Sequence, residues 1–70
     1  MSQNSRILDY MILHGSITAL EAVNNLGVMR LASRVHDLKD RGHNIVTVMV
    51  EGVNRFGETT KYARYYLNRG

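Results

Sequence analysis

The chain has 70 residues, of which 44% are hydrophobic, so we expect one domain over residues 1–70 with a thin core; a domain this small buries only about 60% of the surface its unfolded chain exposes. The absence of cysteine excludes a disulfide framework and a thiolate metal site. No apolar run approaches the roughly 18 residues that span a bilayer, and the polar N-terminus has no signal-peptide pattern, so we expect a soluble, cytoplasmic protein without membrane contacts.

A first helix is predicted over residues 4–14. Asn4 or Ser2 can cap its start, and Gly15 follows as a C-terminal stop. Its apolar residues recur with helical spacing and form one stripe, which predicts a scaffold helix. The stripe consists of Ile7, Leu8, Met11 and Ile12.

A second helix is predicted to begin at Thr18. The Thr18 hydroxyl can accept from the backbone N–H of Glu21, and the Glu21 carboxylate can accept from the N–H of Thr18, which is a capping box. We expect Leu20 and Val23 to face the core. Gly27 permits the positive φ angle that ends this helix, so a short turn follows.

The third helix is predicted from about Met29 to Arg41, with Gly42 as its stop. Its apolar positions are Leu31, Val35 and Leu38, at the i, i+4, i+7 spacing of a core-facing stripe. Two helices joined by a short glycine-containing turn are typical of a helix-turn-helix.

The opposite face of this third helix is polar and basic. In a helix-turn-helix, the second of the paired helices enters the major groove of DNA. Arg30 and Arg34 are one turn apart, and an arginine fork matches the two acceptors of guanine, while the Asp37 carboxylate can accept from cytosine. The alternative is an ordinary solvent face with intrahelical Arg34–Asp37 and Asp37–Arg41 pairs. The residues of this face that we expect to contact DNA are Arg30, Ser33, Arg34 and Asp37.

From residue 44 onward the pattern changes to that of strands. Residues 45–50 are β-branched and apolar, residues 51–58 contain turn residues, and residues 59–67 form a second strand, so we expect an antiparallel hairpin. Ser16 and Ile17 could add a short third strand. The predicted fold class is α+β, with three helices followed by a β-hairpin.

The hairpin carries basic residues at and beside its tip. Cations there can reach the phosphate backbone or the minor groove, and the expected contacts are Asn54, Arg55, Lys61 and Arg64. A solvated tip is the alternative. For Phe56 at the same tip we expect first that it folds back on the sheet, then that it wedges against DNA, then that it joins a partner.

Positive charge is concentrated in the second half of the chain. The formal net charge is +3, with one arginine against two acids in residues 1–29 and eight Lys or Arg against four acids in residues 30–70. The excess therefore begins where the third helix begins. A polyanionic partner is the natural interpretation, and a basic surface without a partner is the alternative.

The sequence resembles the winged helix-turn-helix family, in particular the small domains common in bacteriophages and prophages. The resemblance covers almost the whole chain and is most specific in the run Gly27-Val-Met-Arg-Leu-Ala-Ser-Arg-Val-His-Asp-Leu38, followed by the hairpin segments Asn54-Arg-Phe-Gly57 and Tyr62-Ala-Arg-Tyr65. It implies DNA binding in phage gene control, as a transcriptional regulator or an excisionase-like accessory factor. Met29 departs from the family, which favours Thr or Ser as a cap at that position.

Other classes of function receive less support. No phosphate-binding loop, HExxH or nucleophile-elbow motif is present, and His36 and His43 are too few for a convincing metal site, so we expect neither an enzyme nor a cofactor. The main alternative is a winged-helix interaction module that binds a host protein in place of DNA. A monomer and a weak homodimer, through a strand edge or the first helix, both remain open.

Overall fold

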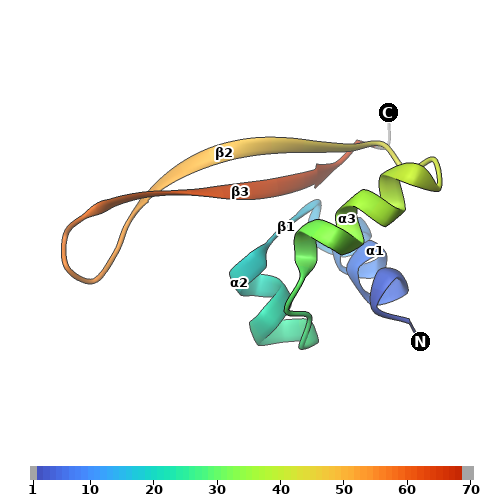
Figure 1. The fold of residues 1–70 in the computed structure, drawn as a ribbon, viewed down its shortest axis with the longest axis horizontal. Helices are drawn as coiled ribbons and strands as arrows, with labels where there is room; N and C mark the ends of the chain where they lie inside the picture. Colours follow the sequence, from blue (N-terminus) through green and yellow to red (C-terminus); the bar gives the residue numbers. More distant parts are fainter. Residues whose placement is uncertain (1, 69–70) are drawn as a thin grey trace.

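The computed structural model describes residues 2–68 as three helices followed by a β-hairpin, which confirms the expected α+β class (Figure 1). None of the helices in this range is long and apolar enough to cross a membrane. The elements in chain order are α1 (Gln3–His14), β1 (Ser16–Thr18), α2 (Ala19–Glu21), the π-helical segment η1 (Ala22–Leu26), α3 (Leu31–Asp40), β2 (Ile45–Val53) and β3 (Thr59–Leu67).

The sheet has the strand order β1-β3-β2 and is antiparallel throughout. The short third strand is therefore present, and it is one residue longer than expected because Thr18 pairs with Arg64. β2 and β3 pair without interruption from Ile45 opposite Leu67 to Val53 opposite Thr59. The helices lie on one side of this sheet, and the far end of the hairpin projects beyond them as an arm (Figure 1).

The core lies between the helices and the near end of the sheet. Tyr65 and Leu67 of β3 pack against it from the sheet side. In α1, Ser2 is the cap, since its hydroxyl accepts from the Ser5 N–H at 3.1 Å. The buried apolar residues are Ile7, Met11, Ile17, Ala22, Val28, Leu31, Val35, Leu38 and Ile45.

The stripe predicted on α1 is wider than the face that the fold buries. Ile7 and Met11 are fully buried, but Leu8 is half-buried and Ile12 is 45% exposed. Because α1 packs against β1, α3, η1 and β3, its burial follows the Ile7–Met11 line and leaves the flanks of the stripe more exposed.

The capping box of α2 is confirmed, because Thr18 Oγ1 accepts from the Glu21 N–H at 3.2 Å and Glu21 Oε1 accepts from the Thr18 N–H at 3.1 Å. The expectation that Leu20 and Val23 face the core is wrong, since they are 69% and 38% exposed. Thr18 is buried at the start of this helix, so Ala22, which lies one turn later on the same face, is the residue that points into the core.

The third helix begins later than predicted, at Leu31, and ends at Asp40. Arg30 occupies the N-cap position with φ −120° and ψ 62°, and its side chain makes no capping hydrogen bond. Neither Met29 nor Arg30 offers a side-chain oxygen to the first N–H groups of the helix, so the chain stays non-helical up to Arg30.

The hairpin is longer and its loop shorter than predicted. β2 continues to Val53, so the expected loop 51–58 contracts to residues 54–58. Asn54 makes this possible, because its Oδ1 accepts from the N–H groups of Phe56 at 2.9 Å and Glu58 at 3.0 Å. One amide side chain thus closes the turn by satisfying two loop N–H groups.

Candidate nucleic-acid interface

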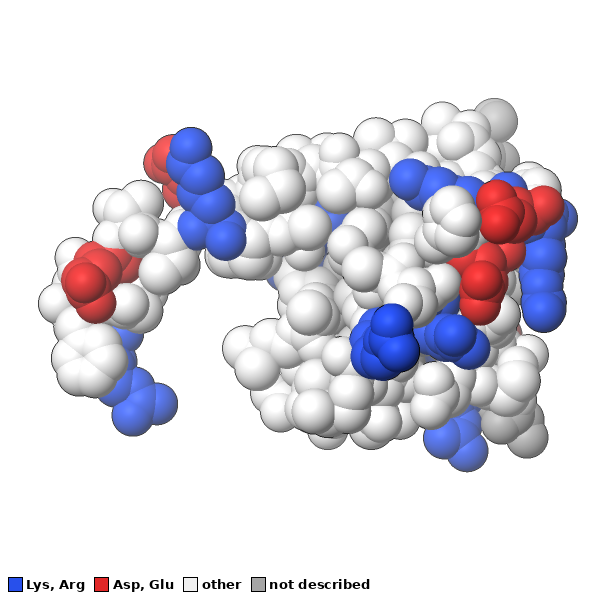
Figure 2. Space-filling view, viewed as in Figure 1, with Lys and Arg blue, Asp and Glu red and all other residues white. Residues whose placement is uncertain are grey.

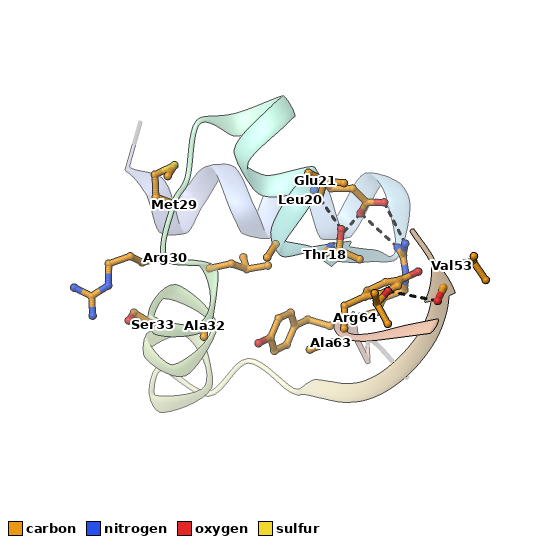
Figure 3. Close-up of a pocket in the computed structure, with 16 residues that line it drawn as sticks. Thr18, Leu20, Glu21, Met29, Arg30, Ala32, Ser33, Val53, Ala63 and Arg64 are labelled. Atoms are coloured by element: carbon orange, nitrogen blue, oxygen red, sulfur yellow. Dashed lines mark hydrogen bonds and ion pairs between the residues drawn. The ribbon is translucent and has the colours of Figure 1, made fainter. Parts of the chain in front are cut away.

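A groove separates the helical body from the hairpin arm. It has a volume of about 880 Å³ and is bounded on the helical side by α2, the connection after it and the start of α3, and on the other side by β2 and β3 (Figure 3). Leu20, Met29 and Arg30 lie on the helical rim, and Val53 and Ala63 belong to the hairpin. A concave surface of this kind can receive a convex ligand.

Arg30 is the free cation at this rim. Its side chain is exposed, and no residue between 2 and 68 forms an ion pair with it. In Figure 3 the guanidinium points away from the groove floor, and Ser33 lies beside it on the first turn of α3. Because Arg30 precedes the helix, its guanidinium group lies at the N-terminal end of α3, where the helix dipole favours an anionic or electron-rich ligand.

Arg34 is held by its own helix. Its Nη2 lies 3.4 Å from Asp37 Oδ2, so the intrahelical pair considered as an alternative does form. Both side chains remain accessible, at 37% and 41% exposed. An exposed pair of this kind contributes about 0–1 kcal/mol, so the guanidinium can exchange its carboxylate for another acceptor at little cost. Arg34 also lines one hollow together with Arg30, so the two residues are neighbours on this surface.

Arg64, one of the residues expected to contact DNA from the hairpin, is engaged in bonds within the protein. Its Nη1 donates to Ser16 Oγ at 3.0 Å and to Glu21 Oε1 at 3.4 Å, and its Nη2 donates to Glu21 Oε2 at 3.2 Å (Figure 3). The hydrogen bond to Glu21 raises the pKa of Arg64, and this effect exceeds the opposing effect of burial. Arg64 therefore joins β3 to β1 and to the capping box of α2.

Some polar residues near the hairpin tip stabilise the turn, and others are exposed to solvent. Asn54 is occupied by the turn, and its Nδ2 also donates to Glu58 Oε1 at 3.2 Å. Arg55 and Lys61 are exposed, and Lys61 is directly opposite Glu51 in the ladder. Arg55 and Lys61 are thus the cations that the hairpin can present to a ligand.

Phe56 does not fold back on the sheet, contrary to the first expectation, because its side chain is 78% exposed. The hydrogen bond from its N–H to Asn54 Oδ1 fixes the backbone of the tip. That tight turn keeps the aromatic ring at the far end of the arm.

Charged groups flank the groove, and Glu21, Arg30 and Arg64 are the charged residues among those that line it. Figure 2 shows basic side chains on the helical body and toward the far end of the arm, with acidic ones beside them and a mostly uncharged surface between. The arrangement offers cations on both sides of a hollow and apolar surface within it.

Sequence reasoning missed the apolar rim of this groove. Leu20, Met29 and Val53 are 69%, 77% and 73% exposed. Two local features go with this exposure: Leu20 directly precedes Glu21 of the capping box, and Met29 lies just before a helix whose start no side chain caps. Apolar residues at such positions lie outside any core-facing stripe.

Comparison with known protein families gives one result. A family model described as a winged helix-turn-helix domain matches residues 2–70, which is nearly the whole chain. No curated protein and no solved structure matches the chain significantly.

Proposed function

The chain belongs to the winged helix-turn-helix family, and from that premise we propose that it binds double-stranded DNA sequence-specifically, as a transcriptional regulator or an excisionase-like accessory factor of a phage. The observation that carries the proposal is Arg30, which forms no ion pair with residues 2–68 and stands at the N-terminal end of α3, on the rim of a groove that the hairpin faces. Family and geometry together support one surface for the duplex.

In this proposal the N-terminal end of α3 enters the major groove. The fork of Arg30 reads guanine, Ser33 bonds a neighbouring base edge, and Arg34 leaves Asp37 to join them. Asp37, once released, accepts from cytosine. The exposed apolar side chain of Met29 can contact the methyl group of a thymine.

The hairpin, acting as the wing, grips the DNA beside that groove. Arg55 and Lys61 contact phosphates or the minor groove, and Asn54 shapes the tip that presents them. The exposed ring of Phe56 can act as a wedge at a base step. Arg64 has a positioning role, because it is bonded to Glu21 and Ser16.

The test is selection of a preferred duplex from a random pool, followed by affinity measurements on that duplex and on an unrelated one. Arg30→Ala should weaken binding to the selected duplex by about 1–3 kcal/mol and should affect the unrelated duplex much less. Arg41→Ala removes the same charge from the opposite end of α3 and serves as the matched control. Equal losses on both duplexes, or an equal effect of the two variants, would contradict base reading by Arg30.

A second candidate is the interaction module that binds a host protein. The exposed apolar groups around the arm, among them Leu20, Met29, Val53 and Phe56, favour it, because such side chains are more typical of protein interfaces. A mobility-shift assay set beside a pull-down separates the two. Absence of any duplex binding at low salt, together with a protein partner lost in Met29→Ser, would decide for the module.

A further inference from the structure

In the part of the chain that the structure describes, no strand pairs with the outer edge of β2. The sheet order β1-β3-β2 puts β2 at an edge over all nine of its residues. The Asn68 N–H donates to the Asn44 carbonyl at 2.8 Å and the Asn54 N–H to the Glu58 carbonyl at 3.0 Å, so the even-numbered positions of β2 bond to β3. The odd-numbered positions therefore point their N–H and C=O groups outward.

This edge lacks the features that usually protect an edge strand. Natural edges are short, bulged, or broken by lysine or proline. β2 has nine residues, an uninterrupted register with β3, no lysine and no proline, and Glu51 is its one charged residue. The opposite edge, β1, is only three residues long. Beside the open edge, Val46, Val48 and Met49 are 45%, 43% and 62% exposed.

We propose that this edge binds the same edge of a second copy of the chain, antiparallel about a two-fold axis. A two-fold contact requires a self-complementary strand, and only outward-pointing residues can exchange hydrogen bonds across it. The register centred on Met49 satisfies both conditions and pairs the whole strand, with Ile45 opposite Val53 of the partner subunit. The two sheets then become one sheet of six strands.

Charge and packing select the same register. Centring on Met49 places Glu51 opposite Thr47 of the partner subunit, where a hydroxyl can donate to the carboxylate. Centring on Glu51 would place two like charges directly opposite each other, which is destabilising. In the same register, Val48 lies opposite Val50 of the partner subunit, which makes a β-branched cross-strand pair.

The size of the contact predicts a weak dimer. Nine residues from each copy are fewer than the roughly 20–30 residues a side in a standard interface, so we expect dissociation on the order of micromolar or weaker. The inference does not depend on DNA binding, because it rests on the outer backbone edge of β2, although Gly52 and Val53 of this strand also line the groove.

Cross-linking tests the register directly. The chain has no cysteine, so Met49→Cys introduces a single thiol. Directly opposite residues of a hydrogen-bonded antiparallel pair have Cα atoms about 5.5 Å apart, within the range that a disulfide spans. Under mild oxidation, Met49→Cys should therefore form a covalent dimer. Leu13→Cys, on the exposed face of α1, is the control that should stay monomeric, and cross-linking at Leu13 instead, or equally at both sites, would overturn the proposal.

Sedimentation velocity tests the contact without cross-links. Met49→Lys places two lysines opposite each other at the two-fold axis, so the dimer dissociation constant should rise by about tenfold or more, whereas Leu13→Lys makes the same chemical change on α1 and should leave it unaltered. Circular dichroism checks that both variants fold, as expected for exposed positions. A wild-type protein that is monomeric up to about 1 mM, a dimer broken by Leu13→Lys alone, or open-ended assemblies larger than a dimer would overturn the proposal.

Discussion

Glu21 performs two structural tasks with one carboxylate. Its Oε1 accepts from the Thr18 N–H and so completes the capping box, while both oxygens accept from Arg64 of β3. Ser16 accepts a further hydrogen bond from the same guanidinium. At the scale of single residues, this cluster fixes the start of the helix-turn-helix to the strand that leads from the wing.

We predict that Glu21 and Arg64 are energetically coupled. Glu21→Gln keeps a side chain suited to the capping box but removes the charge that faces Arg64, and Arg64→Met removes the fork. In a double-mutant cycle by chemical denaturation the coupling should be about 1 kcal/mol, since contacting residues with charge-assisted hydrogen bonds couple in this range. Additive effects of the two substitutions would show that the contact contributes nothing.

The pH dependence of this contact follows from the raised pKa of Arg64. A cation whose pKa is higher in the folded state stabilises the fold at every pH below its ordinary value, and the effect is lost only as the pH rises through the folded value. For arginine that window lies in strongly alkaline solution, so deprotonation of Arg64 should not change stability near neutral pH.

At the scale of elements, α3 starts without a cap at the position where the proposed function needs a cation. Arg30 holds the N-cap position and satisfies none of the first N–H groups of the helix. Ser, Thr, Asp or Asn there would stabilise the helix but would remove the fork from the groove rim. The start of α3 thus lacks the stabilisation of a cap at the position where the proposed function places a base contact.

We therefore predict opposite effects of one substitution on stability and on binding. Arg30→Ser should be about 0.5–1 kcal/mol more stable than Arg30→Ala, because the serine hydroxyl can accept from an N–H of the first turn. Both variants should lose DNA affinity to the same extent. Thermal denaturation and anisotropy titration measure the two quantities, and an Arg30→Ser variant no more stable than Arg30→Ala would contradict the account of the helix start.

What could be predicted from the sequence was mostly local. The capping box at Thr18 and Glu21 depends on residues three apart, so it was recognised without the fold. The exposure of Leu20 could not be predicted, because the burial of Thr18 decides which face of α2 turns toward the core. The partner of Arg64 lies 43 positions away and depends on the register of β1 with β3. The pairing of Arg34 with Asp37 was foreseen as an alternative because both lie on one helix face.

At the scale of the whole molecule, a packed body carries an arm that the body supports at one end only. Ile45 and Leu67 at the near end of the hairpin contact the core, whereas Val53 and Thr59 at the far end are exposed. The greatest extent of the molecule is 38 Å against 20 Å for the smallest. In the proposed complex, an arm of this kind can adjust to a duplex while α3 stays fixed.

We predict a gradient of local stability along the hairpin. Amide hydrogen exchange should be slow at even-numbered positions near the body, such as Val46, and faster at those near the tip, such as Gly52, although both bond to β3 in the same ladder. Duplex DNA should slow exchange at the tip more than near the body. Uniform protection along β2 would contradict the description of a partly supported arm.

We propose that α3 and the wing contact the same DNA duplex at once. The salt dependence of binding tests this most directly. For the selected duplex, the logarithm of the association constant should fall linearly with the logarithm of salt concentration, and Lys61→Ala should reduce the slope by about one, because one phosphate contact is lost. Lys39→Ala, an exposed lysine in the last turn of α3, should leave the slope unchanged. Binding that does not respond to salt, or equal slopes for the wild type and Lys61→Ala, would contradict the account.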